Sequence, residues 1–314
     1  MKRLQNKIAE SRLTLPITAA YASLVWALGG AVVDQMWMQF ACFVLTTYVI
    51  VELNTTFVLL RTYSRMVSCV FLCLTCSSPF LFPAIDGGIV ALCYSIMYMP
   101  LFNGYQDRTS PGWNFYAFLA LGVASLLWVQ ILYFVPLMWI FMVFSLRSMS
   151  WRTFFASLLG LITPYWFASL WFIFTEDIAT PIAHFTQLTE FMPLYGETPN
   201  LLSVYESLGA SRCLTFAVVT PMLFTGIIHY LRKRQNDKLN TRMYYSVFIV
   251  NTIAALTLTI LQPQHFDFTF RMAIVSGSPA IAHFLTHTRT FITNISFIVM
   301  LTATVTLTIV NLLI

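Results

Sequence analysis

Two arginines, Arg212 and Arg271, are the residues whose type and position suggest ligand chemistry. Arg271 stands in the segment HFDFTFRMAIVSGSPAIAHF, at 265–284, where almost no other cation is near it in sequence. A guanidinium binds a phosphate through two parallel hydrogen bonds, and the first turn of a helix adds free N–H groups. The pattern predicts a phosphate site with Arg271 as the main ligand and Arg212 assisting. The alternative is a salt bridge from Arg271 to Asp267, or a side chain that extends to lipid headgroups.

Two carboxylates stand apart from the other acidic residues. Asp34 follows the first long apolar stretch, where it is either a general base or only the end of a helix. Glu52 lies inside the apolar run YVIVELNTTFVLL, nine residues before Arg61. A carboxylate inside a membrane is costly to desolvate, so Glu52 predicts either proton coupling or a structural hydrogen bond to a neighbouring helix.

Two groups of histidines and cysteines have spacings that a metal site could use. His283 and His287 are four residues apart, a spacing that puts both on one helix face, but their position beside a basic turn favours an interfacial role. Cys69, Cys73 and Cys76 also share a face, and small buried wall residues are the better interpretation. We therefore predict no metal, no disulfide and no cofactor.

The composition shows which elements must position these residues. Hydrophobic residues make up 58% of the chain and charged residues only 9%, against roughly 25% in soluble domains. Apolar runs of the length that crosses a bilayer as a helix recur along the chain. We predict an all-α, polytopic transmembrane bundle with about 10 or 11 membrane segments, near 13–33, 36–60, 66–85, 88–102, 113–127, 130–146, 153–175, 213–231, 243–261, 272–286 and 291–314.

The basic residues set the predicted orientation. With the N-terminus in the cytoplasm, 15 of the 17 lysines and arginines lie on the cytoplasmic side, as the positive-inside rule requires. Only Arg212 and Arg271 lie outside. Acidic residues show the reverse preference. We predict one integral membrane domain over 1–314, in which 1–12 is cytoplasmic, 176–211 is the longest external loop and 232–242 is a basic cytoplasmic loop.

The stretch 113–146 fits no ordinary span. Two helices of 15 residues would each rise only about 22 Å, short of a hydrocarbon core of roughly 30 Å. We favour a short pair that turns back near Gln130 and lines a protein cavity. One long tilted helix, kinked at Pro136, is the alternative.

The stretch 115–166 resembles the middle of membrane glycosyltransferases of the GT-C superfamily. The resemblance rests on Gly122, Ala124, Leu126 and Pro136, followed by a basic turn at Arg147 and Arg152 and a span that contains Pro164-Tyr165. Arg271 followed by Pro279 is similar to a late span of the same superfamily. Most of the chain also looks like uncharacterised bacterial inner-membrane proteins of similar length.

The resemblance implies a role in envelope biogenesis at the bacterial inner (cytoplasmic) membrane. The ligand would be a sugar on a polyprenyl-phosphate carrier, with Asp34 as base and Arg271 and Arg212 as phosphate ligands. The external loop after the first span is far shorter than in GT-C enzymes, and Gln35 stands where a second acid would be expected.

Two other functions stay open: a transporter or flippase-like carrier centred on Glu52 and 113–146, and a non-catalytic subunit of a larger complex. Phosphate-binding glycine loops and the common hydrolase motifs are absent from the sequence. We expect membrane lipids as partners and no nucleic acid; protein partners do not follow from the sequence.

Overall fold

The computed structural model describes residues 4–175, 179–190, 201–288 and 290–314, and every regular element in these ranges is a helix. The all-α prediction is confirmed. Six of the helices are long and apolar enough to cross a membrane, and shorter apolar helices accompany them. The chain is therefore a multi-pass integral membrane protein.

The helices form two compact units, residues 1–88 with 202–314 (unit 1) and residues 89–201 (unit 2). The boundary falls inside α5 (Ile85–Asn103), so no linker marks it in the sequence. The helices of unit 1 are α1 (Leu4–Glu10), α2 (Thr14–Leu28), α3 (Trp37–Phe57), α4 (Met66–Cys76), η1 (Pro79–Leu81), α10 (Leu201–Ser207), α11 (Ala210–Lys233), η3 (Arg234–Asn236), α12 (Leu239–Leu261), η4 (Pro263–His265), α13 (Phe266–His287) and α14 (Phe291–Leu313). Unit 2 holds α6 (Pro111–Leu127), η2 (Val129–Tyr133), α7 (Phe134–Phe144), α8 (Trp151–Thr175) and α9 (Ala179–Thr186).

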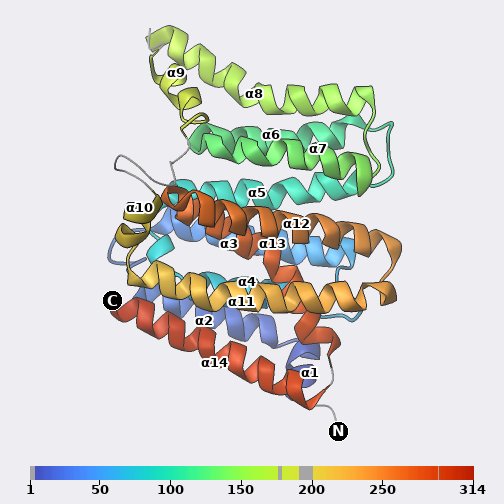
Figure 1. The fold of residues 1–314 in the computed structure, drawn as a ribbon, viewed down its shortest axis with the longest axis vertical. Helices are drawn as coiled ribbons and strands as arrows, with labels where there is room; N and C mark the ends of the chain where they lie inside the picture. The colour runs from blue at the N-terminus through green and yellow to red at the C-terminus, as the bar shows by residue number, and fades with distance from the viewer. Residues whose placement is uncertain (1–3, 176–178, 191–200, 289) are drawn as a thin grey trace. The chain divides into compact units, whose positions relative to one another are not determined.

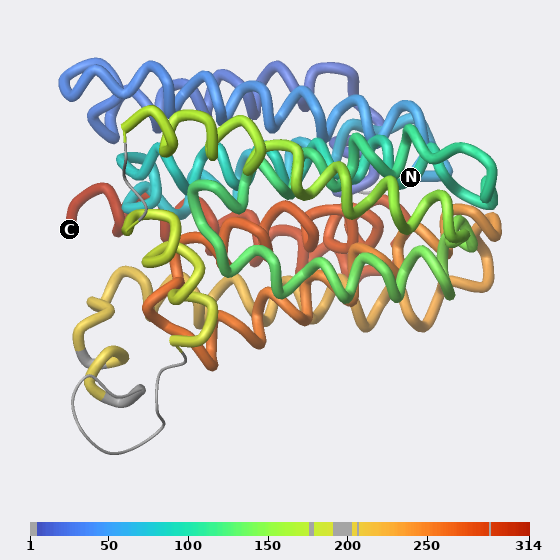
Figure 2. The backbone as a smooth tube through the Cα atoms, turned by 90° about the horizontal axis from the view of Figure 1, so that it is seen from above, coloured from blue at the N-terminus to red at the C-terminus, as the bar shows by residue number. Residues whose placement is uncertain are grey.

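Helix α13 is the core of unit 1. Of its 22 residues, 18 are buried, and it packs against α1, α4, α11 and α12 (Figure 1). Figure 2 shows α11, α12 and α13, coloured from yellow-orange to red, running along one another. A Cβ atom added to Gly226 of α11 would lie 2.7 Å from the backbone nitrogen of Ile281, so the two backbones touch at this glycine.

The N-terminal segment is more than a solvated tail. Within 1–12, α1 packs on α13, and the buried Gln5 side chain donates to the Leu285 carbonyl at 2.5 Å and to Thr288 Oγ1 at 2.7 Å. Asn6 donates to the Thr288 carbonyl at 3.1 Å. These bonds fix α1 at the C-terminal end of α13.

The expected segment 66–85 is not one helix. α4 ends at Cys76, a short η1 follows, and α5 begins at Ile85. The predicted break between the segments 66–85 and 88–102 is wrong, because Asp86 and Gly87 lie in the first turn of α5. The real break lies earlier, near Pro79, which has no N–H to continue the hydrogen bonds of α4.

The short pair predicted in 113–146 is confirmed within unit 2. α6 ends at Leu127, Trp128 is extended, and η2 and α7 follow. The rings of Phe118 in α6 and Trp139 in α7 stack 6.3 Å apart, so α7 folds back along α6. Gln130 lies at this turn and is buried.

Candidate functional site

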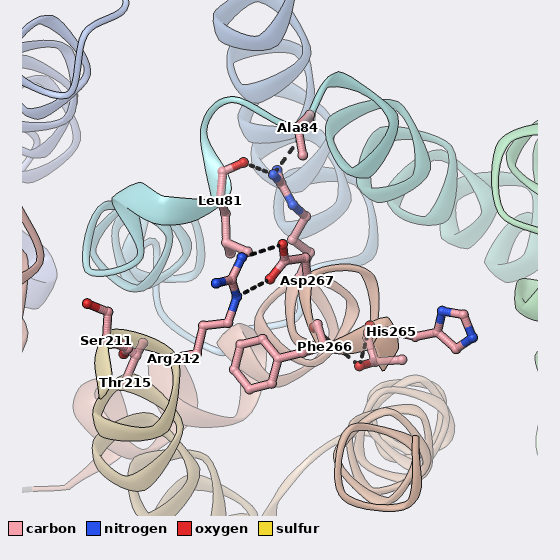
Figure 3. Close-up of polar contacts among 10 residues, drawn as sticks. Leu81, Ala84, Ser211, Arg212, Thr215, His265, Phe266 and Asp267 are labelled. Atoms are coloured by element: carbon pink, nitrogen blue, oxygen red, sulfur yellow. Dashed lines mark hydrogen bonds and ion pairs between the residues drawn. The ribbon is translucent and has the colours of Figure 1, made fainter. Parts of the chain in front are cut away.

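The end of unit 1 where α13 begins, called here the Asp267 end, holds the two predicted phosphate ligands. Arg212 in α11 donates from Nε to Asp267 Oδ1 at 2.9 Å and from a terminal nitrogen to Oδ2 at 3.0 Å (Figure 3). Its guanidinium also lies over the ring of Phe80, 5.3 Å from the centroid. The guanidinium of Arg212, which was predicted to assist in binding a phosphate, is therefore already paired with the Asp267 carboxylate.

Arg271 has a different partner from the one proposed for it. The predicted salt bridge to Asp267 is wrong, since that carboxylate pairs with Arg212. A terminal nitrogen of Arg271 donates instead to the carbonyl oxygens of Leu81 and Ala84, and its Nε is buried without a partner. Carbonyls in a break between helices lack partners of their own, so Arg271 fastens the connection between η1 and α5 to α13.

Asp34 lies exposed in the turn between α2 and α3, where its N–H donates to the Gly30 carbonyl at 2.8 Å. Its carboxylate covers Gly30, whose φ of 93° favours glycine. A hollow of about 590 Å³ at this end is lined by Gly30 and Arg212, but neither Asp34 nor Arg271 reaches it. The three residues predicted to act together share one end of the unit without forming one site.

Glu52 makes its hydrogen bond within its own helix. Thr56 Oγ1, one turn later in α3, donates to Glu52 Oε1 at 3.1 Å. The polar contact between segments comes from its neighbour Asn54, whose amide donates to the Ser64 carbonyl at 2.8 Å.

A largely apolar, half-open cavity of about 440 Å³ in unit 1 is lined by α1, α2, α4, α11, α13 and α14. Cys69, Val70 and Cys73 form part of its wall, which agrees with the wall role predicted for these cysteines. Ile281 and Leu285 of α13 line another side. The volume is in the range of cavities that hold small ligands.

Cationic and polar groups gather where α1 meets α2, at one edge of this cavity. Lys7, Ser11 and Thr14 line it there. A second hollow, of about 550 Å³, has Arg12 and Arg65 in its wall. The cavity therefore combines an apolar interior with one cation, Lys7, at its edge, and Arg12 and Arg65 line a separate hollow.

The other end of unit 1, called the Asp237 end, holds a buried ionic cluster that the sequence did not predict. Asp237 follows η3 in the basic loop 232–242, yet its side chain is 0% exposed. Its Oδ1 accepts from Arg61 Nε at 2.5 Å, and its Oδ2 lies 3.2 Å from His283 Nε2. His283 is also 0% exposed, so the interfacial role predicted for it is wrong.

The environment of Asp237 keeps its carboxylate ionised. Burial alone would raise the pKa of Asp237, but the hydrogen bonds and charges of His283 and Arg61 outweigh it and hold the pKa below its usual value. Arg242 holds the loop in shape, because its guanidinium donates to the backbone carbonyls of Asp237 at 2.9 Å and Gln235 at 2.6 Å.

Comparison with protein-family models, curated proteins and solved structures finds no match for this chain.

Proposed function

We propose that this integral membrane protein binds an amphiphile with an anionic head, whose apolar tail enters the cavity of unit 1. The observation that carries the proposal is the cavity itself, an apolar space of about 440 Å³ with Lys7 at its edge. An apolar tail gains free energy on leaving water in proportion to the apolar area that is covered. The head would stay at the edge, near Lys7.

The charge at the edge favours an anion over a neutral head. Arg12 and Arg65 border one hollow, and Lys7 borders the cavity on the other side of α2. Basic residues near a membrane surface each contribute about 1 kcal/mol to the attraction of anionic lipids. A phosphate matches this edge, because the Lys7 ammonium binds phosphate as a point charge.

A polyprenyl-phosphate carrier, the ligand that the resemblance to GT-C enzymes implies, has both required parts. On this proposal the protein works at the bacterial inner membrane, in envelope biogenesis, with its N-terminus in the cytoplasm. Transferase chemistry would need Asp34, which is exposed, and Arg271, whose donors reach backbone carbonyls. Binding is therefore the favoured function, and catalysis stays a prediction that the double variant Asp34→Asn/Arg271→Ala tests.

The experiment measures the binding of a fluorescent long-chain alkyl phosphate, and of the alcohol with the same chain, to protein in neutral-lipid nanodiscs. Val70→Trp fills the cavity and should weaken both ligands at least tenfold. Val44→Trp, on an exposed face of α3, is the matched control and should change neither. Lys7→Gln should weaken only the phosphate, by about fivefold for a loss of roughly 1 kcal/mol. Equal affinities of the Val70→Trp variant and the wild type would contradict the proposal.

A further inference from the structure

The buried cluster at the Asp237 end surrounds one imidazole with titratable side chains from α11, α12, α13 and the loop that holds Asp237. The ring of His283 lies 5.7 Å from His229 and 4.9 Å from Tyr230, both in α11. Tyr245 of α12 is 5.5 Å away, and His287 of α13 is 4.5 Å away. Asp237 and Arg61 complete the shell, and the further cations of this loop are Arg232, Lys233, Arg234, Lys238 and Arg242.

Three imidazole nitrogens in this cluster are buried without a hydrogen-bond partner: His229 Nδ1, His283 Nδ1 and His287 Nε2. Buried polar atoms are nearly always satisfied, so three exceptions among three neighbouring rings call for an explanation. A metal ion is one candidate. Yet among the described residues no three histidine, cysteine or acidic side chains are arranged to hold one.

The contact with Asp237 fixes the chemistry that His283 can perform. Because Nε2 faces the carboxylate at 3.2 Å, the N–H of the neutral ring lies on Nε2, and Nδ1 carries a free lone pair. Arg61 already balances the charge of Asp237. A proton that binds to Nδ1 converts the ring to an imidazolium beside a carboxylate. The new N–H can then be donated, after a ring rotation, to one of the other two unpartnered nitrogens, His229 Nδ1 or His287 Nε2.

We propose that Asp237 and His283 form a proton-binding site, in which His283 takes up the proton at Nδ1 and the ionised Asp237 stabilises the resulting charge. His229 and His287 supply the neighbouring acceptors. The ordinary alternative is a purely structural ion pair that ties the loop between α11 and α12 to α13. That alternative predicts no change of protonation in the range where histidine titrates.

The position of His283 on α13 links this site to the cavity. Ile281 and Leu285 lie two residues to either side of it, and residues two apart on a helix point about 200° apart. The same turns of α13 therefore face the proton site on one side and the cavity on the other. A shift of α13 that accommodates the added charge would move the cavity wall, which gives proton-linked binding. This second step rests on the proposed function, whereas the proton site does not.

Magic-angle-spinning NMR of histidine-labelled protein in nanodiscs tests the site without any ligand. The chain has five histidines, and His283→Gln assigns the signal of interest. Between pH 5 and 8, roughly the range in which histidine titrates, His283 should pass from the Nε2-protonated ring to the imidazolium. Asp237→Asn should lower its proton affinity at least tenfold. Asp267→Asn, at the other end of α13, is the matched control and should leave the titration unchanged.

Two results would overturn the proposal. One is a His283 signal that keeps a single protonation state, neutral or charged, across the range in the wild type, a test that needs no variant to fold. The other is an unchanged titration in Asp237→Asn, or in His287→Gln if the first variant does not fold. Binding of the alkyl phosphate between pH 5 and 8 then tests the link. If His283 titrates but the affinity for the alkyl phosphate does not depend on pH, the link between proton and ligand is wrong and the proton site stands. If the alkyl phosphate does not bind at all, only the proposed function is wrong.

Discussion

The two ends of α13 hold aspartate–arginine pairs of the same chemistry in different surroundings. At the Asp267 end, both partners are about one-third exposed, with 29% for Asp267 and 36% for Arg212. At the Asp237 end, Arg61 is 39% exposed, but Asp237 and His283 are 0% exposed. Roughly 24 Å of helix separates the two, at 1.5 Å per residue from Asp267 to His283. Removing one partner of a solvated pair costs little stability. Removing one partner of a buried pair costs more, because the remaining charge is left without a partner and without water.

The largest expected effect is the difference between two matched substitutions. Asp237→Asn leaves His283 buried beside an unbalanced Arg61. Removing one member of a buried pair costs about 3–5 kcal/mol, and the partial exposure of Arg61 places this case near the lower value. Asp267→Asn should cost about 1 kcal/mol or less, as exposed pairs do. Unfolding free energies in detergent measure both, and equal losses would show that burial does not distinguish the two ends.

A second prediction concerns the close approach of α11 to α13. Gly226→Ala places a methyl group 2.7 Å from the Ile281 nitrogen, a backbone atom that cannot move aside, so the helices must separate. We expect a loss of about 1–3 kcal/mol, typical of overpacking. A displaced His229 signal in the NMR spectrum should accompany it. Gly112→Ala is the control, because nothing lies within 4 Å of its added methyl group. Similar stabilities of the two variants would mean that α11 and α13 are not in contact at Gly226.

The pH dependence of stability gives a third way to separate the two ends. The pKa of Asp237 is lowered in the folded protein, so its ionisation stabilises the fold above the unfolded value, near pH 4. That contribution is lost as the pH falls below about 4, through the folded pKa. Unfolding measured from pH 6 to pH 3 should show the loss in the wild type and in Asp267→Asn. Asp237→Asn should lack it, and a wild-type decline that persists in Asp237→Asn would assign the effect to other carboxylates.

The sequence predicted the helices better than the contacts among them. Long apolar runs reveal spans because a bilayer demands about 20 apolar residues, and the break near Gln130 followed from the length of 113–146 and the placement of charges. The Asp237 cluster was not predictable in this way. Asp237 lies in a basic loop that is typical of a solvated surface, and 46 residues separate it from His283. The place of Arg271 at a helix start predicted a phosphate ligand, because no sequence pattern shows that backbone carbonyls lie within its reach.

The smallest expected effects are at Arg271 and Asp34. Arg271→Gln removes the donors to the Leu81 and Ala84 carbonyls, and a lost hydrogen bond of this kind costs about 1 kcal/mol. Hydrogen exchange should rise at the start of α5 and stay unchanged at the Asp237 end. Asp34→Asn, on an exposed turn, should lie within roughly 0.5 kcal/mol of the wild type. Unchanged exchange in Arg271→Gln would show that this side chain does not hold the connection.

The most direct test of the proposed amphiphile site uses the native thiols of its wall. Cys73 lines the cavity of unit 1, whereas Cys213 of α11 is exposed and does not line it. Alkylation of both by a membrane-permeant maleimide is followed by mass spectrometry, with and without a saturating long-chain alkyl phosphate. We predict that the ligand protects Cys73 and leaves the labelling rate of Cys213 unchanged. An unchanged rate at Cys73 under saturating ligand would contradict the central claim that an amphiphile occupies this cavity.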